Sequence, residues 1–175
     1  MAAAALHLIA GKIAAGKSTL AARLAREHGA ILLSEDQWTA ALWPGELTSL
    51  DAYLDRTSRL KSVLGPHVTA LLKAGLTVVM DFPANTPKQR AWLRSLFEDA
   101  GAAHVLHFLD VDDAVCKARL RARNAAGQHA YAPSEAEFDL FTRYFAPPGP
   151  DERFNLMTYG ADGVRADAAA SARRT

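Results

Sequence analysis

The chain has 175 residues, half of them apolar and 22% charged, and 20 Lys and Arg against 19 Asp and Glu give a formal net charge of +1. This length suits one compact domain with a full core. The near-neutral charge argues against extended wrapping of nucleic acid, but it is compatible with a local basic pocket. The single cysteine, Cys116, cannot form an internal disulfide, and no apolar run approaches the length of a membrane span. The composition predicts a cytoplasmic globular protein.

An apolar strand expected at residues 5–10 leads into a glycine-rich loop. Residues 11–18 read GKIAAGKS, the G-x-x-x-x-G-K-[ST] pattern of a phosphate-binding P-loop. Glycines at both ends let the backbone approach phosphate oxygens, and the N–H groups of the loop and of the next helix point at the anion. Lys17 can reach the β- and γ-phosphates, and the Ser18 hydroxyl can hold Mg²⁺. The residues predicted to bind ATP are Gly11, Ala14, Ala15, Gly16, Lys17, Ser18 and Thr19.

Strands and helices alternate along the rest of the chain. A helix at residues 17–28 closes at Gly29, and a short apolar run at 30–33 is the second strand. Helical periodicity at 51–73 is interrupted at Gly65-Pro66, which predicts two helical pieces. The further expected elements are a strand at 76–80, a helix from Thr86 and Pro87 to about Ala100, a strand at 103–109, a helix at 112–124, a helix from the Ser134–Glu137 capping box to about Phe145, and a strand at 154–159.

This alternation predicts an α/β fold with a parallel sheet of about five strands and helices on both faces. Together with the P-loop it indicates a three-layer P-loop NTPase of the nucleoside-kinase-like type, with a short lid, in residues 1–160. Residues 161–175 have almost no large apolar side chain, so we expect a loose tail there. Ligands of such sheets lie beyond the carboxyl ends of the strands.

Two carboxylates are expected at that edge of the sheet. Asp36 could accept the proton of an attacking hydroxyl and orient its oxygen, or it could only cap a helix beginning at Gln37. Asp81 could hold Mg²⁺ through water or clamp a substrate-binding arginine, or it could lie in a surface turn before Pro83. Phe82 stands where motor ATPases typically have a water-activating Glu, and the chain has no Asn-Lys-x-Asp guanine motif. These features favour a kinase over a GTPase or a mechanical ATPase.

Basic residues recur on the helix after the fourth strand. Arg119 and Arg123 are four positions apart and share a helical face, as do Lys117 and Arg121. With the Gly-containing segment 125–133, this face is typical of a lid that brings guanidinium groups onto phosphates and stabilises transition-state charge. The alternative is a solvated basic face, and we expect Arg121 to point to solvent in either case.

Side chains that could recognise a phosphate acceptor lie mostly between the second and third strands. Trp38 or Trp43 could stack on a ring or base, although each could instead belong to the core. Arg56 and Arg59, three apart on a helix, could meet an anionic acceptor, and Arg90 is another candidate anion contact. Tyr53 lies in the same region.

The P-loop, Ser34-x-Asp36, Asp81 and the Arg119-Leu120 helix resemble the small P-loop kinases, a group that includes gluconate-kinase-like enzymes, zeta toxins, polynucleotide 5′-kinases and chloramphenicol phosphotransferases. Residues 145–155 resemble the segment before the last strand in bacterial members, and the similarity spans about residues 5–160. The chain departs from the group in lacking the complete lid signature of a sugar kinase and in being shorter than typical zeta toxins. The resemblance does not identify the acceptor.

The resemblance implies roles for individual residues. Asp36 would deprotonate the acceptor, and Lys17 and Ser18 would handle phosphate and Mg²⁺. The lid arginines would clamp ATP, and the loop around Pro147 and Pro148 would lie near the adenine.

The sequence therefore predicts an ATP- and Mg²⁺-dependent phosphotransferase acting on a hydroxyl of a small molecule such as a sugar, nucleoside or antibiotic. A polynucleotide 5′-hydroxyl kinase is the less favoured alternative because of the near-neutral charge, and a non-catalytic ATP-binding sensor is the other. The assigned residues are Asp36, Lys17, Arg119 and Arg123 for catalysis, Arg119 and Arg123 also for ATP, Asp36, Trp38, Arg56, Arg59, Asp81 and Arg90 for the acceptor, and Ser18 and Asp81 for Mg²⁺.

Overall fold

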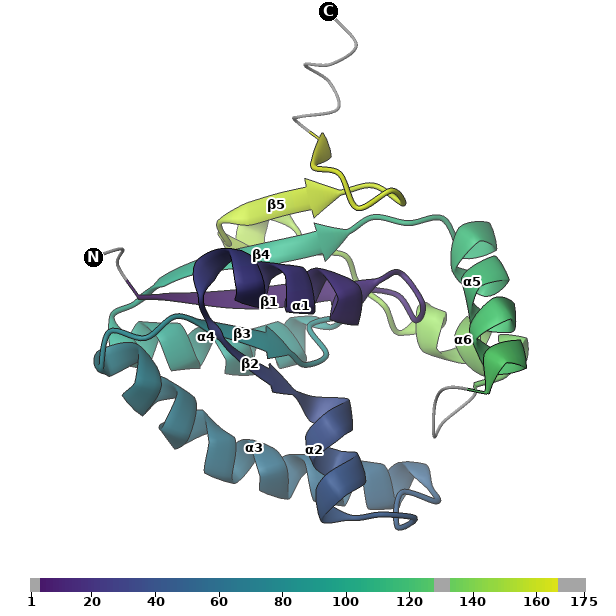
Figure 1. The fold of residues 1–175 in the computed structure, drawn as a ribbon, viewed down its shortest axis with the longest axis horizontal. Coiled ribbons are helices and arrows are strands. Elements are labelled where there is room, and N and C mark those ends of the chain that lie inside the picture. Colours follow the sequence, from purple (N-terminus) through teal and green to yellow (C-terminus); the bar gives the residue numbers. More distant parts are fainter. Residues whose placement is uncertain (1–3, 128–132, 167–175) are drawn as a thin grey trace, which may run out of the picture.

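The computed structural model describes residues 4–127 and 133–166, and within them a five-stranded sheet lies between layers of helices (Figure 1). Every neighbouring pair of strands is parallel, in the order β2-β3-β1-β4-β5. The predicted α/β fold with a five-stranded parallel sheet is confirmed. The strands are β1 (Ala5–Gly11), β2 (Ile31–Ser34), β3 (Val78–Asp81), β4 (Ala103–Leu109) and β5 (Leu156–Tyr159).

Helices cover both faces of the sheet, with α1 on one face and α3 and α4 on the other (Figure 1). The arrowheads of the strands point toward the side where α5 and α6 lie, so these two helices are close to the carboxyl ends of the strands. No helix in the described part of the chain is both long and apolar enough to cross a membrane. The helices are α1 (Lys17–His28), α2 (Glu35–Leu42), α3 (Leu50–Lys73), α4 (Pro87–Ala100), α5 (Asp113–Ala126), α6 (Glu135–Arg143) and the short 3-10 helix η1 (Pro150–Glu152).

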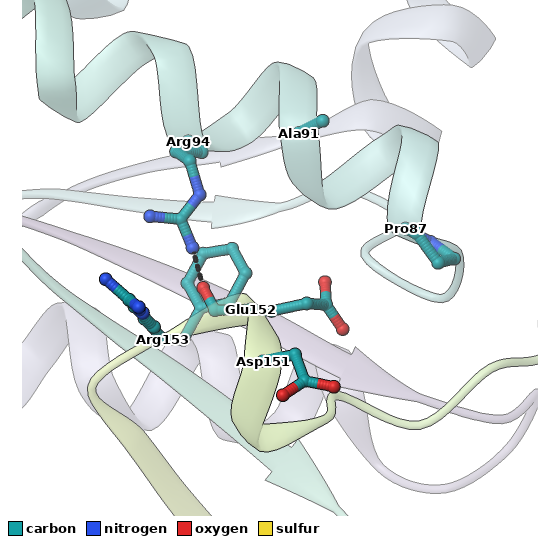
Figure 2. Close-up of a pocket in the computed structure, with 7 residues that line it drawn as sticks. Pro87, Ala91, Arg94, Asp151, Glu152 and Arg153 are labelled. Atoms are coloured by element: carbon teal, nitrogen blue, oxygen red, sulfur yellow. Dashed lines mark hydrogen bonds between the residues drawn. The ribbon is translucent and has the colours of Figure 1, made fainter.

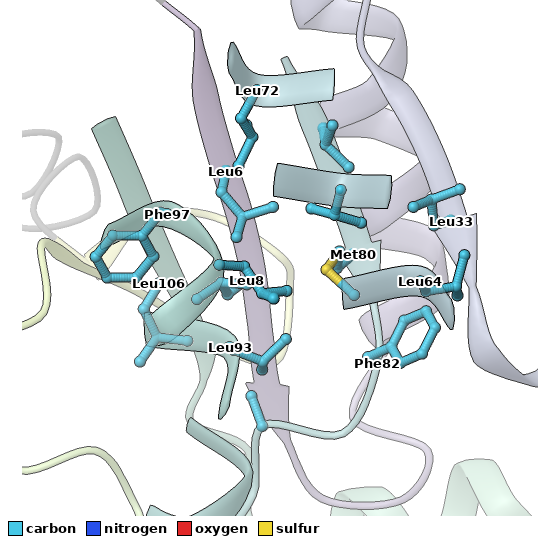
Figure 3. Packing of buried hydrophobic residues seen from close by; sticks show 14 of the residues in the cluster. Leu6, Leu8, Leu33, Leu64, Leu72, Met80, Phe82, Leu93, Phe97 and Leu106 are labelled. Carbon is cyan, nitrogen blue, oxygen red and sulfur yellow. The ribbon is translucent and has the colours of Figure 1, made fainter. Parts of the chain in front are cut away.

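The core is divided by the sheet into two clusters, because successive side chains of a strand point to opposite faces. Leu6 and Leu8 of β1 pack on the side of α3 and α4, against residues such as Leu64 and Leu93 (Figure 3). Ile9 points the other way, into a cluster with apolar residues of α1, α5 and α6. Burial on both faces explains why the strands read as near-continuous apolar runs.

The helix break predicted at Gly65-Pro66 is wrong, since α3 runs without interruption for 24 residues. A proline inside a helix costs about 3 kcal/mol. Leu64 and Val68 lie on either side of it, however, and are buried in the same cluster, where each contributes about 1.5–3 kcal/mol. Gly65 faces α4, and a Cβ there would make an ordinary van der Waals contact with Leu96 Cδ2 at 3.5 Å. Packing along one face therefore keeps the helix continuous.

Candidate active site

The P-loop follows β1 directly and folds back around the side chain of Lys17. The Lys17 ammonium donates hydrogen bonds of 2.8 Å to the carbonyl oxygens of both Gly11 and Lys12. Gly16 has a φ of 107°, which side chains rarely adopt, and a Cβ at Gly11 would lie only 3.1 Å from Leu109 Cβ. The backbone angle thus favours glycine at Gly16, and close packing favours it at Gly11.

Ala14, in the middle of the loop, has a left-handed backbone with a φ of 60°. A residue with a Cβ pays about 1–2 kcal/mol for this conformation, so the surrounding contacts must hold it there. Strain of this kind is common in phosphate loops, where backbone N–H groups must converge on an anion. The geometry fits the predicted phosphate cradle.

A residue that the sequence did not single out, Asn85, connects the P-loop to two other segments. Its side-chain oxygen accepts a 2.9 Å hydrogen bond from the Gly11 N–H. Its own N–H donates to Gln89 in the first turn of α4, and its carbonyl oxygen accepts from the Ala146 N–H after α6. Asn85 directly precedes the predicted Thr86 N-cap, but nothing in the sequence indicates a bond to a residue 74 positions away.

The two predicted carboxylates do come together at the mouth of the P-loop. The Asp81 carboxylate, at the end of β3, lies close enough to the Ser18 hydroxyl, in the first turn of α1, for a favourable polar interaction, and it interacts electrostatically with Lys17 and Asp36. Burial raises the pKa of Asp81, and Ser18 and Lys17 oppose that rise. Burial likewise lowers the pKa of Lys17, although the charges of Asp81 and Asp36 counteract it. Three strand ends thus supply one cluster of charged and hydroxyl groups.

Asp36 lies in the first turn of α2, which begins at Glu35 with Ser34 at the N-cap position. The capping position that was the alternative for Asp36 is therefore taken by Ser34. Asp36 is exposed, so a substrate can reach its carboxylate.

Ser18 and Asp81 fit the Mg²⁺ that a P-loop fold implies. A neighbouring hydroxyl and carboxylate are hard oxygen donors of the kind that this ion prefers, and Mg²⁺ usually takes few protein ligands beside waters and substrate phosphates. No group of three or more His, Cys, Asp or Glu residues in the described ranges forms a metal-binding cluster.

Arg119 of α5 reaches from the predicted lid to the P-loop. Its guanidinium donates a 3.1 Å hydrogen bond to the carbonyl oxygen of Ala15 and another to that of Ala161, after β5. Gly163 in the same loop accepts a hydrogen bond from Arg23 of α1. Arg119 therefore joins the P-loop to the loop that follows β5, which includes the first residues of the predicted tail.

The other basic residues of α5 divide between two sides of the helix. Arg123 carries a positive charge close enough to Lys17 to lower its pKa further, and its buried Nε has no hydrogen-bond partner among the described residues. Arg121 is 60% exposed and pairs with Glu135 of α6 at 2.6 Å. The predicted difference between Arg123 and Arg121 agrees with this geometry. Residues 128–132 of the predicted lid lie outside the described residues.

The cationic residues predicted to meet the acceptor are held by neighbouring carboxylates. Arg56 binds Glu46 at 2.7 Å and Asp55 at 3.2 Å, with its guanidinium 5.8 Å from the centre of the Trp43 ring. Arg59 pairs with Asp55 at 3.0 Å, one helical turn away. Trp43 packs against the core, which is one of the two positions predicted for it, the other being a stack on a substrate ring or base.

Arg90 occupies a different environment from the one we predicted. It is only 1% exposed, binds both carboxylate oxygens of Glu152 at 2.6 and 2.7 Å, and donates to the carbonyl oxygens of Ala84 and Ala146. A guanidinium engaged on all three nitrogens fastens α4 to the segment after α6, which corrects the expectation of an anion contact. The sequence placed Arg90 on the helix after Asp81, but it did not indicate that the Arg90 side chain is buried.

A cavity of about 340 Å³ lies beside this ion pair, between α4 and η1 (Figure 2). Arg94 crosses it and donates to the backbone oxygen of Glu152, and its guanidinium lies 4.2 Å from the centre of the Phe154 ring. None of the residues predicted for the site is among its lining residues, which are Pro87, Ala91, Arg94, Asp151, Glu152, Arg153 and Phe154.

Solved structures with the same fold include several kinases. A candidate kinase from Chloroflexus aurantiacus is 23% identical, with a TM-score of 0.73, over 99% of this chain and 96% of that chain. A sugar kinase from Janibacter sp. HTCC2649 is 16% identical, with a TM-score of 0.61, over 92% of this chain and 87% of that chain. The APS kinase CysC of Mycobacterium tuberculosis, solved with AMPPNP and APS, is 21% identical, with a TM-score of 0.59, over 99% and 98%.

These structures show that the chain has the fold of the P-loop kinases. A comparison with curated protein sequences finds no match. The profile of the AAA domain family matches residues 6–148, which is most of the chain and includes the P-loop, Asp36, Asp81 and the arginines of α5. The chain belongs to the AAA domain family.

Proposed function

We propose that the protein is an ATP-dependent kinase that transfers the γ-phosphate to a hydroxyl group of a small molecule. The observation that supports this most strongly is the convergence of Lys17, Ser18, Asp81 and Asp36 at the carboxyl ends of three strands. The fold is shared with kinases, one of which was solved with AMPPNP, and this supports a nucleotide at the P-loop.

The residues divide the reaction among them. The P-loop N–H groups and Lys17 hold the β- and γ-phosphates, while Arg119 and Arg123 approach from α5 and stabilise charge that develops on the transferred group. The exposed Asp36 accepts the proton of the acceptor hydroxyl and holds its oxygen in line with the γ-phosphorus. Ser18 and Asp81 would hold Mg²⁺, which would neutralise phosphate charge.

The adenine has two candidate neighbours. Pro147 and Pro148, implied by the resemblance, come directly after Ala146 and so lie near Asn85. The loop at 161–163 is connected to the P-loop by Arg119 and to α1 by Arg23. We favour the second, because it is fixed to the two elements that hold the phosphates.

The pairing of the acceptor-side arginines favours an uncharged acceptor. Arg90 is buried against Glu152 and Arg56 binds two carboxylates, so neither can neutralise an anionic substrate without breaking these pairs. Arg59 is 67% exposed, and its surface pair with Asp55 is weak. A neutral sugar, nucleoside or antibiotic therefore suits the site better than a polynucleotide 5′ end. Trp38, 37% exposed on α2 near Asp36, offers such a molecule an aromatic face.

An ADP-release assay with Mg²⁺-ATP tests the proposal against neutral sugars, nucleosides, aminoglycoside and phenicol antibiotics, and 5′-hydroxyl oligonucleotides. Asp36→Asn should lower kcat at least about 100-fold and leave ATP affinity unchanged, because it removes only the proton acceptor. Asp99→Asn, at the exposed far end of α4, is the matched control and should behave as the wild type. Turnover that survives in Asp36→Asn would contradict the base assignment, and ATP binding without any acceptor-dependent turnover would favour the sensor.

A further inference from the structure

The residue next to the proposed base, Glu35, is one of the most buried charged residues in the described part of the chain, with 2% of its surface exposed. An acidic residue in the first turn of a helix interacts well with the helix dipole, but this interaction does not require burial. Burying a carboxylate costs free energy unless hydrogen bonds and an opposite charge compensate it. The position of Glu35 therefore needs an explanation beyond helix formation.

Its partners all come from α3. Glu35 Oε1 accepts a 2.6 Å hydrogen bond from the Tyr53 hydroxyl, and Oε2 lies 3.7 Å from the Lys61 ammonium. Tyr53 and Lys61 are eight positions apart and so lie two turns apart on one face of α3. The Lys61 ammonium also lies 5.5 Å from the centre of the Trp92 ring on α4. One buried carboxylate thus joins the first turn of α2 to two turns of α3.

The electrostatics connect this network to the neighbouring residue. Burial raises the pKa of Glu35, the Tyr53 hydrogen bond and Lys61 oppose that rise, and the charge of Asp36 adds to it. Burial also raises the pKa of Tyr53, and both Glu35 and Asp36 contribute. Asp36 therefore lies within electrostatic reach of both members of the short O–H···O bond.

We propose that Glu35 is a positioning residue, which through Tyr53 and Lys61 fixes the first turn of α2 on α3 and so sets the direction of the Asp36 carboxylate. This inference rests on the proposed function, in which Asp36 is the base. An apolar contact could hold α2 on α3 without burying a charge, since such replacements are often neutral or stabilising. A directional bond one residue from the base instead fixes orientation, and a displacement of about 1 Å can lower turnover about 100-fold.

The test uses Tyr53→Phe, which removes only the hydroxyl, and Glu35→Gln, which removes the charge that faces Lys61. Thr57→Val is the matched control, because Thr57 on α3 is as buried as Glu35 and its hydroxyl bonds only to backbone oxygens of its own helix. Each variant is assayed for kcat and KM by ADP release, well below its melting temperature, and for hydrogen exchange of the α2 amides. Exchange needs no acceptor.

We expect Tyr53→Phe and Glu35→Gln each to lower kcat about 10-fold and to leave the ATP dissociation constant within about twofold. The kcat of the double variant should be little lower than that of the less active single variant, because both substitutions break the same network. The α2 amides should exchange about 10-fold faster in both variants, whereas Thr57→Val should change only the melting temperature.

Wild-type kcat and α2 exchange in Tyr53→Phe and Glu35→Gln would overturn the proposal and leave Glu35 a structural residue. Asp36→Asn, measured alongside, separates this outcome from failure of the proposed function. If Asp36→Asn loses turnover while the network variants keep it, only the positioning role is wrong. If Asp36→Asn keeps turnover, the base assignment fails and the positioning proposal is overturned with it.

Discussion

Acid should unfold this protein through a pair of buried histidines on the α1 face of the sheet. His7 Nδ1 and His107 Nε2 are 2.9 Å apart, and His107 Nδ1 is hydrogen-bonded to the Tyr159 hydroxyl at 2.8 Å. The His28 ring stacks on His7, with the ring centres 4.5 Å apart. A charge on either member of the pair would be buried beside its neighbour.

The size of the effect follows from the two pKa values. Burial lowers the pKa of His7 from 6.5 to about 4, with the charge of His28 adding to it, and lowers that of His107 to about 3, with the charge of His7 adding. Below pH 6.5 these two histidines bind protons in the unfolded chain but not in the folded protein. Their neutral forms therefore cost no free energy of unfolding above pH 6.5, and the free energy of unfolding falls as the pH drops toward 4. Near pH 5 two such protons give a slope of about 2.7 kcal/mol per pH unit, and His7 alone accounts for about 3 kcal/mol by pH 4. Domains of this size have only about 5–15 kcal/mol in total.

The assay is urea unfolding, followed by far-UV circular dichroism at several pH values between 7 and 4.5. The double variant His7→Gln/His107→Gln should show a slope of the unfolding free energy against pH that is smaller by about 2.7 kcal/mol per pH unit near pH 5. His67→Gln, on the exposed surface of α3, is the control and should keep the wild-type slope. If the double variant keeps the wild-type slope, the histidine pair is not the source of the acid sensitivity and the reasoning is refuted.

Two further substitutions test contacts that the structure revealed. Arg90→Met leaves the Glu152 carboxylate without its guanidinium partner, so urea unfolding should show a loss of about 3 kcal/mol, and a loss below about 1 kcal/mol would contradict the role of this ion pair. Asn85→Ala leaves the Gly11 N–H without its acceptor, and we expect a loss of about 1 kcal/mol in ATP binding, or about fivefold in Kd by calorimetry. An unchanged Kd in a folded Asn85→Ala protein would show that the P-loop keeps its shape without this bond.

The sequence alone was sufficient for features that depend on neighbouring residues. The P-loop pattern, the glycines that end α1 and α4, the N-cap at Thr86 and the capping box at Ser134 are read over a few positions, and the structure contains all of them. Strand and helix periodicity likewise predicted the parallel sheet, and the strand-end rule brought Asp81 to Ser18. The tail expected from residue 161 stays a prediction beyond residue 166.

The tertiary structure decided which long-range partner each polar side chain finds. Pro66 was expected to break a helix, yet burial on both sides of it keeps α3 continuous. Arg90 was expected at the acceptor but is buried against Glu152, and neither Asn85 nor Glu35 was given a role at the site. Their partners lie between 18 and 74 positions away, a separation at which sequence spacing carries no geometric information. Local propensity therefore determined the elements and the phosphate loop, whereas packing between elements determined how the charged groups around that loop are used.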